Sequence, residues 1–201
     1  RKHIKMLLNN NGISMREDNP SFIEIYDNLL SKEECDRIIT AFENSPNVDW
    51  GKTSGGFDFD YKKCKEISRV LHPSDEIGSI IGPHLSLALQ KYDKKYKALE
   101  FQPSWNIYPR FNIQKYEGED DGYKLWHSEH GSTEVSSQRV LAWMIYLNNA
   151  ECGTEFMYYS NLKSKRGRCA IWPSGWQHTH RGVVPNKGVK YIATGWVSLD
   201  K

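Results

Sequence analysis

The second half of the chain repeats one pattern, a short apolar or aromatic stretch followed by a turn rich in Gly, Asn or Pro. Six such stretches of four to eight residues have the alternation or the continuous apolar character of β-strands. They are residues 105–108, 111–116, 140–147, 154–158, 168–172 and 191–197. A run of short strands without intervening helices predicts a β-sandwich or barrel rather than a parallel α/β sheet.

The first half of the chain contributes helices. Ser31 is followed three residues later by Glu34, which is the spacing of a capping box at a helix start. A second, longer helix is expected over residues 74–97, begun at Ser74 and either kinked or restarted at Pro83. Helices that precede a run of strands predict an α+β fold, mainly β, with the helices covering one face of the larger sheet.

A chain of 201 residues is long enough for one domain of ordinary size. We expect an N-terminal extension over residues 1–19, followed by a single domain over 20–201. Within that domain, residues 20–98 would form a helical support and residues 99–198 the β-rich core.

The composition disfavours two kinds of partner. The 27 basic and 25 acidic residues are interspersed and leave a net charge of +2, so no basic face for nucleic acid is indicated. No apolar run approaches the roughly 20 residues that span a bilayer. The four cysteines are scattered and form no CxxC pair, which is typical of reduced thiols and predicts a cytoplasmic location. They are Cys35, Cys64, Cys152 and Cys169.

Two histidine-rich segments of the β-rich half could carry chemistry. In a strand, His127 and Glu129 would point to the same face, and a histidine from a distant strand would complete two imidazoles and one carboxylate. That donor set is the facial triad of non-haem Fe(II) oxygenases. A three-residue pattern is weak alone, because both side chains could lie on a solvated strand edge. His178 and His180 share one strand face and could likewise be exposed turn residues, or half of a zinc site.

Lys190 carries a positive charge that needs a partner of opposite charge if the side chain is buried. It opens the apolar stretch 191–196, and a buried ammonium without a partner is costly. A bound dicarboxylate would pair with this charge. Counted from His180, a glycine stands at +8, Lys190 at +10 and Trp196 at +16.

Taken together, these motifs resemble the Fe(II)- and 2-oxoglutarate-dependent dioxygenases, on their prolyl 4-hydroxylase-like branch. The resemblance covers roughly residues 20–198, and the order and spacing of several motifs make it specific. The similar stretches are Gln114–Gly118, Gly122-Tyr123 with His127 and Glu129, Tyr146–Asn148, Gly153–Phe156, Trp172–Ser174 and His180 through Gly188–Tyr191 to Trp196.

The resemblance implies a double-stranded β-helix, or jelly-roll, and assigns roles to eight residues. The implied iron ligands are His127, Glu129 and His180. Lys190 would hold the distal carboxylate of 2-oxoglutarate, and Tyr116 and Tyr146 match positions that often hydrogen-bond the cosubstrate. Thr154 and Trp196 match positions that line the pocket.

One residue departs from the family pattern, and one metal ligand has to be chosen between two histidines. The common carboxylate is Asp, whereas this chain has Glu129, which is longer by one methylene. The +8 glycine and the +10 lysine select His180 over His178 as the distal ligand. His178 would then lie behind the ligands or on the surface, and His130 receives no metal role.

The resemblance implies Fe(II), 2-oxoglutarate and O₂ as cofactor and cosubstrates, and leaves open whether ascorbate is needed. The expected reaction hydroxylates a C–H bond, with a prolyl residue of a peptide or protein as the first choice of substrate. Succinate and CO₂ would be released. The loop over residues 51–61 is either a lid over a peptide or a plain surface loop.

Alternatives exist within and outside this chemistry. The substrate could be a free amino acid or another small molecule, and a nucleobase is disfavoured because no basic groove is evident. A catalytically silent jelly-roll binding module would not need the triad and Lys190 together, and a cupin-type metal enzyme would not need Lys190. Arg139 and Arg181 could meet an acidic substrate group or be solvated. The sequence does not determine the oligomeric state.

Overall fold

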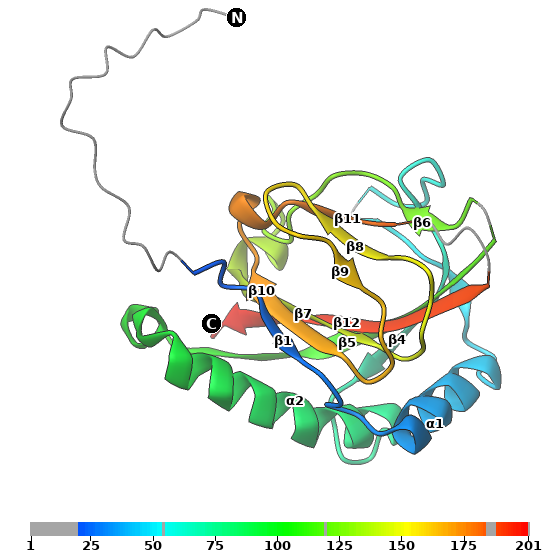
Figure 1. Ribbon diagram of the computed structural model, residues 1–201, viewed down its shortest axis with the longest axis horizontal. Helices are drawn as coiled ribbons and strands as arrows, with labels where there is room; N and C mark the ends of the chain where they lie inside the picture. The colour runs from blue at the N-terminus through cyan, green and yellow to red at the C-terminus, as the bar shows by residue number, and fades with distance from the viewer. Residues whose placement is uncertain (1–19, 54, 119, 184–187, 201) are drawn as a thin grey trace, which may run out of the picture.

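The computed structural model of the chain describes residues 20–53, 55–118, 120–183 and 188–200 (Figure 1). The extension expected over residues 1–19 lies outside the described residues.

A seven-stranded antiparallel sheet forms the centre of the molecule. Its strand order is β1 (Glu24–Tyr26), β10 (Cys169–Pro173), β7 (Arg139–Tyr146), β12 (Val189–Leu199), β5 (Trp105–Glu117), β4 (Lys65–Val70) and β2 (Asp49–Trp50). The strands that are neighbours in space are mostly distant in the chain. The sheet therefore brings the β-rich half and the first strands of the helical half together.

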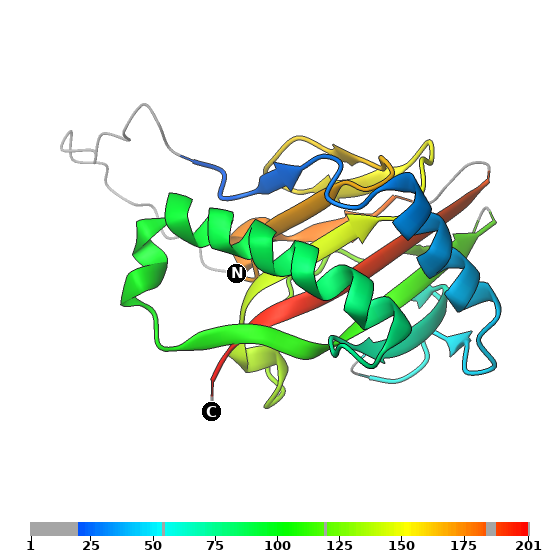
Figure 2. The same cartoon turned by 90° about the horizontal axis from the view of Figure 1, so that it is seen from below.

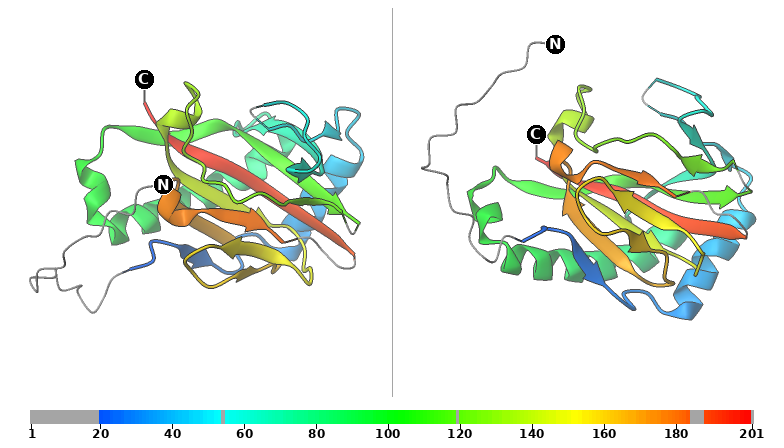
Figure 3. Two further views of the ribbon diagram at one scale, coloured as in Figure 1. Left: turned by 90° about the horizontal axis from the view of Figure 1, so that it is seen from above. Right: turned by 45° about the horizontal axis from the view of Figure 1, so that its top comes forward.

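Two smaller sheets complete the β structure. One has the order β11 (His180–Gly182), β8 (Gly153–Phe156) and β9 (Leu162–Lys163), and the other pairs β3 (Lys62–Lys63) with β6 (Gly122–Tyr123). The three-stranded sheet lies against the face of the large sheet that is turned away from the helices (Figure 3). The expected α+β, mainly β class is confirmed.

Both faces of the large sheet are buried, and β7 shows why. Successive side chains of a strand point to opposite faces. Trp143 and Ile145 pack in the cluster that includes the helices, whereas Met144 and Tyr146 pack in the cluster that includes β8. Because both faces of β7 are buried, its sequence is a continuous apolar run and not an alternation of apolar and polar residues.

Helices α1 (Lys32–Glu43) and α2 (Glu76–Lys95) cover one face of the large sheet (Figure 2). The capping box of α1 is confirmed, since the Ser31 hydroxyl accepts from the Glu34 N–H and the Glu34 carboxylate accepts from the Ser31 N–H. Three short 3₁₀ helices complete the helical structure of the described residues: η1 (Lys97–Phe101), η2 (Ser136–Gln138) and η3 (Trp176–His178).

Helix α2 differs from the expectation at two points. Asp75, and not Ser74, is its N-cap, because the Asp75 carboxylate accepts from the Gly78 N–H at 2.7 Å. The predicted restart at Pro83 is wrong, because the helix continues through this residue. A proline inside a helix costs about 3 kcal/mol. The apolar face of α2 offsets this cost by burial against the sheet, with Ile81 and Leu85 fully covered.

The strand boundaries also differ from the expectation. The two stretches predicted at 105–108 and 111–116 form the single strand β5, which passes through Pro109. The pairing of β5 with β12 shifts between Gly195 and Val197, opposite this proline. A β-bulge tolerates the missing N–H of a proline, so the strand continues.

Among the described helices, none combines the length and the apolar character needed to cross a membrane. All four cysteines are buried and carry free thiols.

Candidate active site and metal centre

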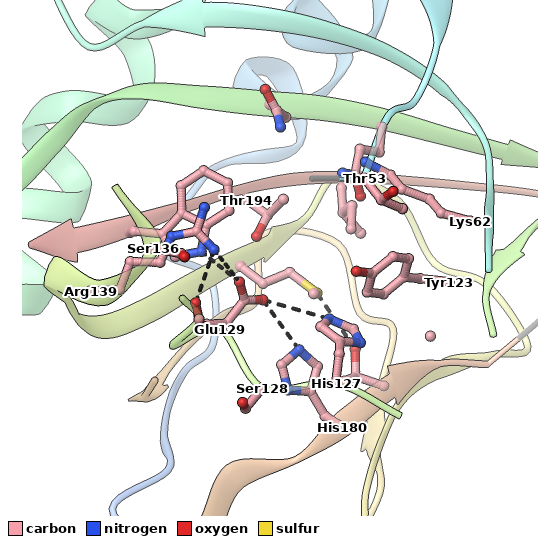
Figure 4. A pocket seen from close by; sticks show the side chains of 18 of the residues that line it. Thr53, Lys62, Tyr123, His127, Ser128, Glu129, Ser136, Arg139, His180 and Thr194 are labelled. Atoms are coloured by element: carbon pink, nitrogen blue, oxygen red, sulfur yellow. Dashed lines mark hydrogen bonds and ion pairs between the residues drawn. The ribbon is translucent and has the colours of Figure 1, made fainter. Parts of the chain in front are cut away.

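Strand pairing brings three potential metal ligands together from distant parts of the chain. His127 and His180 exchange two backbone hydrogen bonds, at 3.0 and 2.9 Å, which fixes them side by side. Glu129 follows two residues after His127 and turns its carboxylate to the same point (Figure 4). One ligand atom from each of the three side chains lies within 4.8 Å of the others.

The backbone orients both imidazole rings. The Nδ1 atom of His127 lies 2.9 Å from the Leu125 carbonyl oxygen, and the Nδ1 atom of His180 lies 2.9 Å from the His178 carbonyl oxygen. Donation from Nδ1 to a carbonyl leaves the lone pair on Nε2. Both Nε2 atoms face Glu129 Oε1, at 3.8 and 3.4 Å.

The two oxygens of Glu129 have different surroundings. Oε2 accepts from the indole N–H of Trp196 at 2.7 Å and from the Arg139 guanidinium at 3.2 Å. Arg139 also donates to the Glu129 backbone oxygen at 3.0 Å and stacks on the Trp196 ring, 3.7 Å from its centroid. Oε1 is therefore the carboxylate oxygen that faces the histidines.

The electrostatics keep His127 and Glu129 in the forms that bind a metal. Burial, reinforced by the neighbouring His180, lowers the pKa of His127 to about 4. Burial raises the pKa of Glu129, but the hydrogen bond with His180 and the charges of the histidines and Arg139 lower it further, so the net pKa lies below its usual range. A neutral His127 imidazole and an ionised Glu129 carboxylate are thus available at neutral pH, and a set of two imidazoles and one carboxylate fits Fe(II).

Lys190 lies buried in the same cavity as the triad. Its side chain is 2% exposed, and its ammonium lies 4.5 Å from the centroid of the Tyr116 ring. Its hydrogen-bond acceptors among the described residues are the carbonyl oxygens of Gly153 and Val183, at 3.4 and 3.3 Å. Burial lowers the pKa of Lys190. A buried ammonium with only long bonds to carbonyls fits the carboxylate of a bound ligand.

One cavity of about 410 Å³ contains both the triad and Lys190. Such a volume suits a small ligand. Seven of the eight residues implied by the sequence line it, namely Tyr116, His127, Glu129, Thr154, His180, Lys190 and Trp196. The eighth, Tyr146, lies behind the wall, and its hydroxyl is 2.7 Å from the Thr154 hydroxyl.

The other candidates of the sequence lie elsewhere. The expected shared strand face of His178 and His180 is wrong, because His178 ends η3 and only His180 is in a strand. His178 is buried, with its Nε2 2.8 Å from the Ser21 carbonyl oxygen. His130 is exposed. Arg181 donates to Glu155 at 2.7 Å and does not line the cavity.

Lys62 and Gln114 are among the cavity residues to which the sequence analysis gave no role. Lys62 is buried and pairs with Glu66 at 2.5 Å. Gln114 bonds the same Glu66 carboxylate, because the two residues are cross-strand partners of β5 and β4. No periodic signal marks either residue, and only the strand register reveals the contact.

Comparison with known proteins agrees with this site. Residues 111–198, which include the triad and Lys190, match the model of the 2OG-Fe(II) oxygenase superfamily. No curated protein is matched significantly by sequence.

Three solved structures share the fold. A viral collagen prolyl hydroxylase from Paramecium Bursaria Chlorella virus-1, solved with 2-oxoglutarate, is 18% identical, with a TM-score of 0.66, over 91% of this chain and 98% of that chain. A Trichoplax adhaerens prolyl hydroxylase, solved with a hypoxia inducible factor peptide, is 16% identical, with a TM-score of 0.67, over 90% and 85%. A Pseudomonas putida prolyl-4-hydroxylase is 11% identical, with a TM-score of 0.66, over 90% and 95%.

Residues 111–198 match the superfamily, and the donor set within them fits the chemistry of an Fe(II)- and 2-oxoglutarate-dependent oxygenase that uses O₂. The fold is the jelly-roll that the solved prolyl hydroxylases share. The resemblance seen in the sequence is confirmed.

Proposed function

We propose that the protein hydroxylates a prolyl residue in a peptide or protein, with release of succinate and CO₂. The observation that carries this proposal is the presence of the triad and the buried Lys190 in one cavity. Bound iron would supply the activation of O₂ that breaks an unreactive C–H bond.

Each residue of the site has a specific task in this proposal. His127, Glu129 and His180 would hold the iron through two imidazoles and one carboxylate. Lys190 pairs with the distal carboxylate of 2-oxoglutarate and so fixes its position in the cavity. Arg139 and Trp196 hold Glu129 Oε2 and keep Oε1 directed at the metal.

Two features support a peptide as substrate. The Trichoplax prolyl hydroxylase with the same fold was solved with a peptide fragment. In this chain, Lys52 and Thr53 bring the 51–61 loop to the cavity wall, and the loop exposes three aromatic side chains. These are Phe57, Phe59 and Tyr61. Exposed aromatic residues next to a cavity suit contact with an extended polypeptide.

The direct test is an aerobic incubation with Fe(II), 2-oxoglutarate and a panel of proline-containing peptides. We expect one added oxygen atom on a prolyl residue by tandem mass spectrometry, with matching succinate. The His180→Ala protein should form neither product, whereas the Arg181→Lys protein, altered outside the cavity, should retain both. Coupled hydroxylation of free amino acids but of no peptide would contradict the proposal.

A further inference from the structure

His178 is a buried histidine that the proposed reaction does not use. It ends the short helix η3, in which Trp176 and Gln177 are exposed and only His178 is buried. A backbone hydrogen bond from the His178 N–H to the Gly175 carbonyl, at 3.0 Å, closes this turn. A 3₁₀ helix of three residues has little stability of its own. The His178 side chain is therefore the one that attaches η3 to the interior.

The imidazole of His178 is anchored through one nitrogen to a distant part of the chain. Its Nε2 atom lies 2.8 Å from the carbonyl oxygen of Ser21, a residue 157 positions away. A carbonyl oxygen only accepts, so Nε2 carries the hydrogen of this bond. Nδ1 is buried and has no hydrogen-bond partner among the described residues. The Nε2 donor is thus the polar contact that holds the ring.

The segment that provides this carbonyl is itself held on both sides. Phe22, the next residue, has a φ of 59°, a left-handed backbone conformation that bulky side chains rarely adopt. Its carbonyl oxygen accepts from the Tyr92 hydroxyl of α2 at 2.8 Å. Two consecutive carbonyl groups are therefore bound to side chains from η3 and from α2. These contacts keep an unfavourable conformation in place, so the Ser21 carbonyl is a fixed acceptor for His178.

A second contact holds the face of the His178 ring. The Tyr159 ring lies nearly parallel to it, with 11° between the two planes and 5.1 Å between the centroids. Tyr159 in turn contacts Phe156, and Phe156 contacts the His180 ring, with centroids 6.5 and 5.5 Å apart. The hydrogen bond at the edge and the stacked ring on the face leave the His178 imidazole little freedom to rotate.

The backbone of His178 connects this anchored side chain to the metal site. Its carbonyl oxygen lies 2.9 Å from Nδ1 of His180. That contact orients the His180 ring and leaves the lone pair on Nε2, the atom that faces Glu129. Because the anchored ring and the carbonyl belong to one residue of a short turn, a displaced side chain would also displace the carbonyl.

We propose that His178 is a positioning residue of the metal site, in which the bond to Ser21 and the stack on Tyr159 fix the carbonyl that orients His180. The inference rests on the proposed role of His180 as a metal ligand. It gives the two neighbouring histidines different tasks: His180 binds the metal, and His178 fixes the orientation of His180. His178 does not bind the metal itself, because its Nε2 is directed at Ser21.

Substitutions of His178 separate the hydrogen bond from the bulk of the ring. His178→Gln keeps a donor nitrogen at about the reach of Nε2, whereas the shorter amide of His178→Asn does not reach Ser21. His178→Leu removes the donor and keeps an apolar side chain. Gln177→Leu, in the exposed part of the same turn, is the matched control. Asp75→Ala controls for lowered stability, because it removes the N-cap of a helix on the opposite face of the large sheet.

The measurement is an anaerobic titration of the metal-free protein with Co(II), followed by proton NMR. A coordinated histidine that keeps an N–H group gives a hyperfine-shifted resonance that exchanges with solvent. We expect two such resonances in the native protein, and the one that is missing in His180→Ala belongs to His180. His178→Leu and His178→Asn should shift the His180 resonance, speed its exchange and weaken Co(II) binding by about 10-fold or more. His178→Gln should restore the resonance and the affinity.

Two results would overturn the inference. One is an unchanged His180 resonance and affinity in folded His178→Leu protein. The other is an equal loss in Gln177→Leu or Asp75→Ala, because lowered stability would then be the cause. If circular dichroism shows that His178→Leu does not fold, Tyr159→Leu removes the stack instead and should shift the same resonance. An unchanged resonance in folded Tyr159→Leu protein would then contradict the inference.

The same spectra separate the inference from the function on which it rests. If His180→Ala retains both resonances, His180 is not a ligand and the proposed metal site is wrong. If His180→Ala loses one resonance and His178→Leu changes neither resonance nor affinity, the proposed site stands and only the inference is wrong.

Discussion

Glu129 uses its two carboxylate oxygens for two different contacts. Oε2 is held by Trp196 and Arg139, and Oε1 faces the two histidines. A glutamate has one more rotatable bond than an aspartate, so its carboxylate needs external contacts to stay in one orientation. The stacked Arg139 and Trp196 side chains provide these contacts.

We predict that Trp196→Phe weakens iron binding by about 10-fold or more, because it removes the indole N–H from Glu129. Isothermal titration of the metal-free protein with Fe(II) under anaerobic conditions measures this affinity. The matched control is Trp176→Phe, since Trp176 is 68% exposed and lies outside the cavity wall. Equal affinities for the Trp196→Phe and Trp176→Phe proteins would show that the indole does not support the ligand.

The pKa of His127 predicts a pH dependence of stability. It is lowered from an ordinary value of 6.5 to about 4 in the folded protein. Between these values the unfolded chain binds a proton that the folded protein does not. The free energy of unfolding of the metal-free protein should therefore fall as the pH decreases from 6.5 to about 4, by on the order of 3 kcal/mol. Urea titrations across this pH range measure the change in the free energy of unfolding. If this free energy falls as steeply with decreasing pH in a His127→Gln protein, the effect does not come from His127.

At the residue scale, spacing predicts which residues meet but not how they share hydrogen bonds. The convergence of His127, Glu129 and His180 could be predicted, because motif order and the distance to Lys190 are properties of the sequence. The position of Tyr146 behind Thr154 could not, because it depends on side-chain contacts across two sheets. The pairing of Arg139 with Glu129 could not be predicted either, because the sequence does not show whether an arginine ahead of a strand is buried or solvated.

At the scale of elements, the start of α2 gives a test by two adjacent substitutions. Asp75→Ala removes the N-cap and should destabilise the protein by about 1 kcal/mol, or about 2–4 °C in Tm. Ser74→Ala should cost less, because the Ser74 hydroxyl bonds only the exposed His72 ring. Asp75→Asn keeps the cap while removing the ion pair with Arg69, and so separates the two contributions. A larger loss for Ser74→Ala than for Asp75→Ala would contradict the observed cap.

Long elements could be predicted from the sequence and the shortest ones could not. The helix at Lys32–Glu43 has a capping box and an apolar face, and β7 is an uninterrupted apolar run. In contrast, β2, β3, β6 and β9 have two residues each, too few for any periodicity. These strands form because they pair with strands from distant parts of the chain, and this pairing cannot be predicted from the local sequence. Two of them matter for the site, since β3 carries Lys62 and β6 carries Tyr123 into the cavity wall.

At the scale of the whole molecule, the two facing sheets explain why the cavity is preformed. The large sheet supplies Tyr116, Lys190 and Trp196, and the small sheet supplies Thr154 and His180. The helices bury the opposite face of the large sheet (Figure 2). Cofactor and cosubstrate sites on strands of two packed sheets need little rearrangement on binding.

We propose that the triad and Lys190 form one site for iron and 2-oxoglutarate. An anaerobic titration of the Fe(II)-loaded protein with 2-oxoglutarate tests this proposal through the weak visible band of the metal chelate. We predict that the band forms in the native protein, is absent in His180→Ala and needs a higher 2-oxoglutarate concentration in Lys190→Ala. No band in folded, iron-loaded native protein would contradict the account.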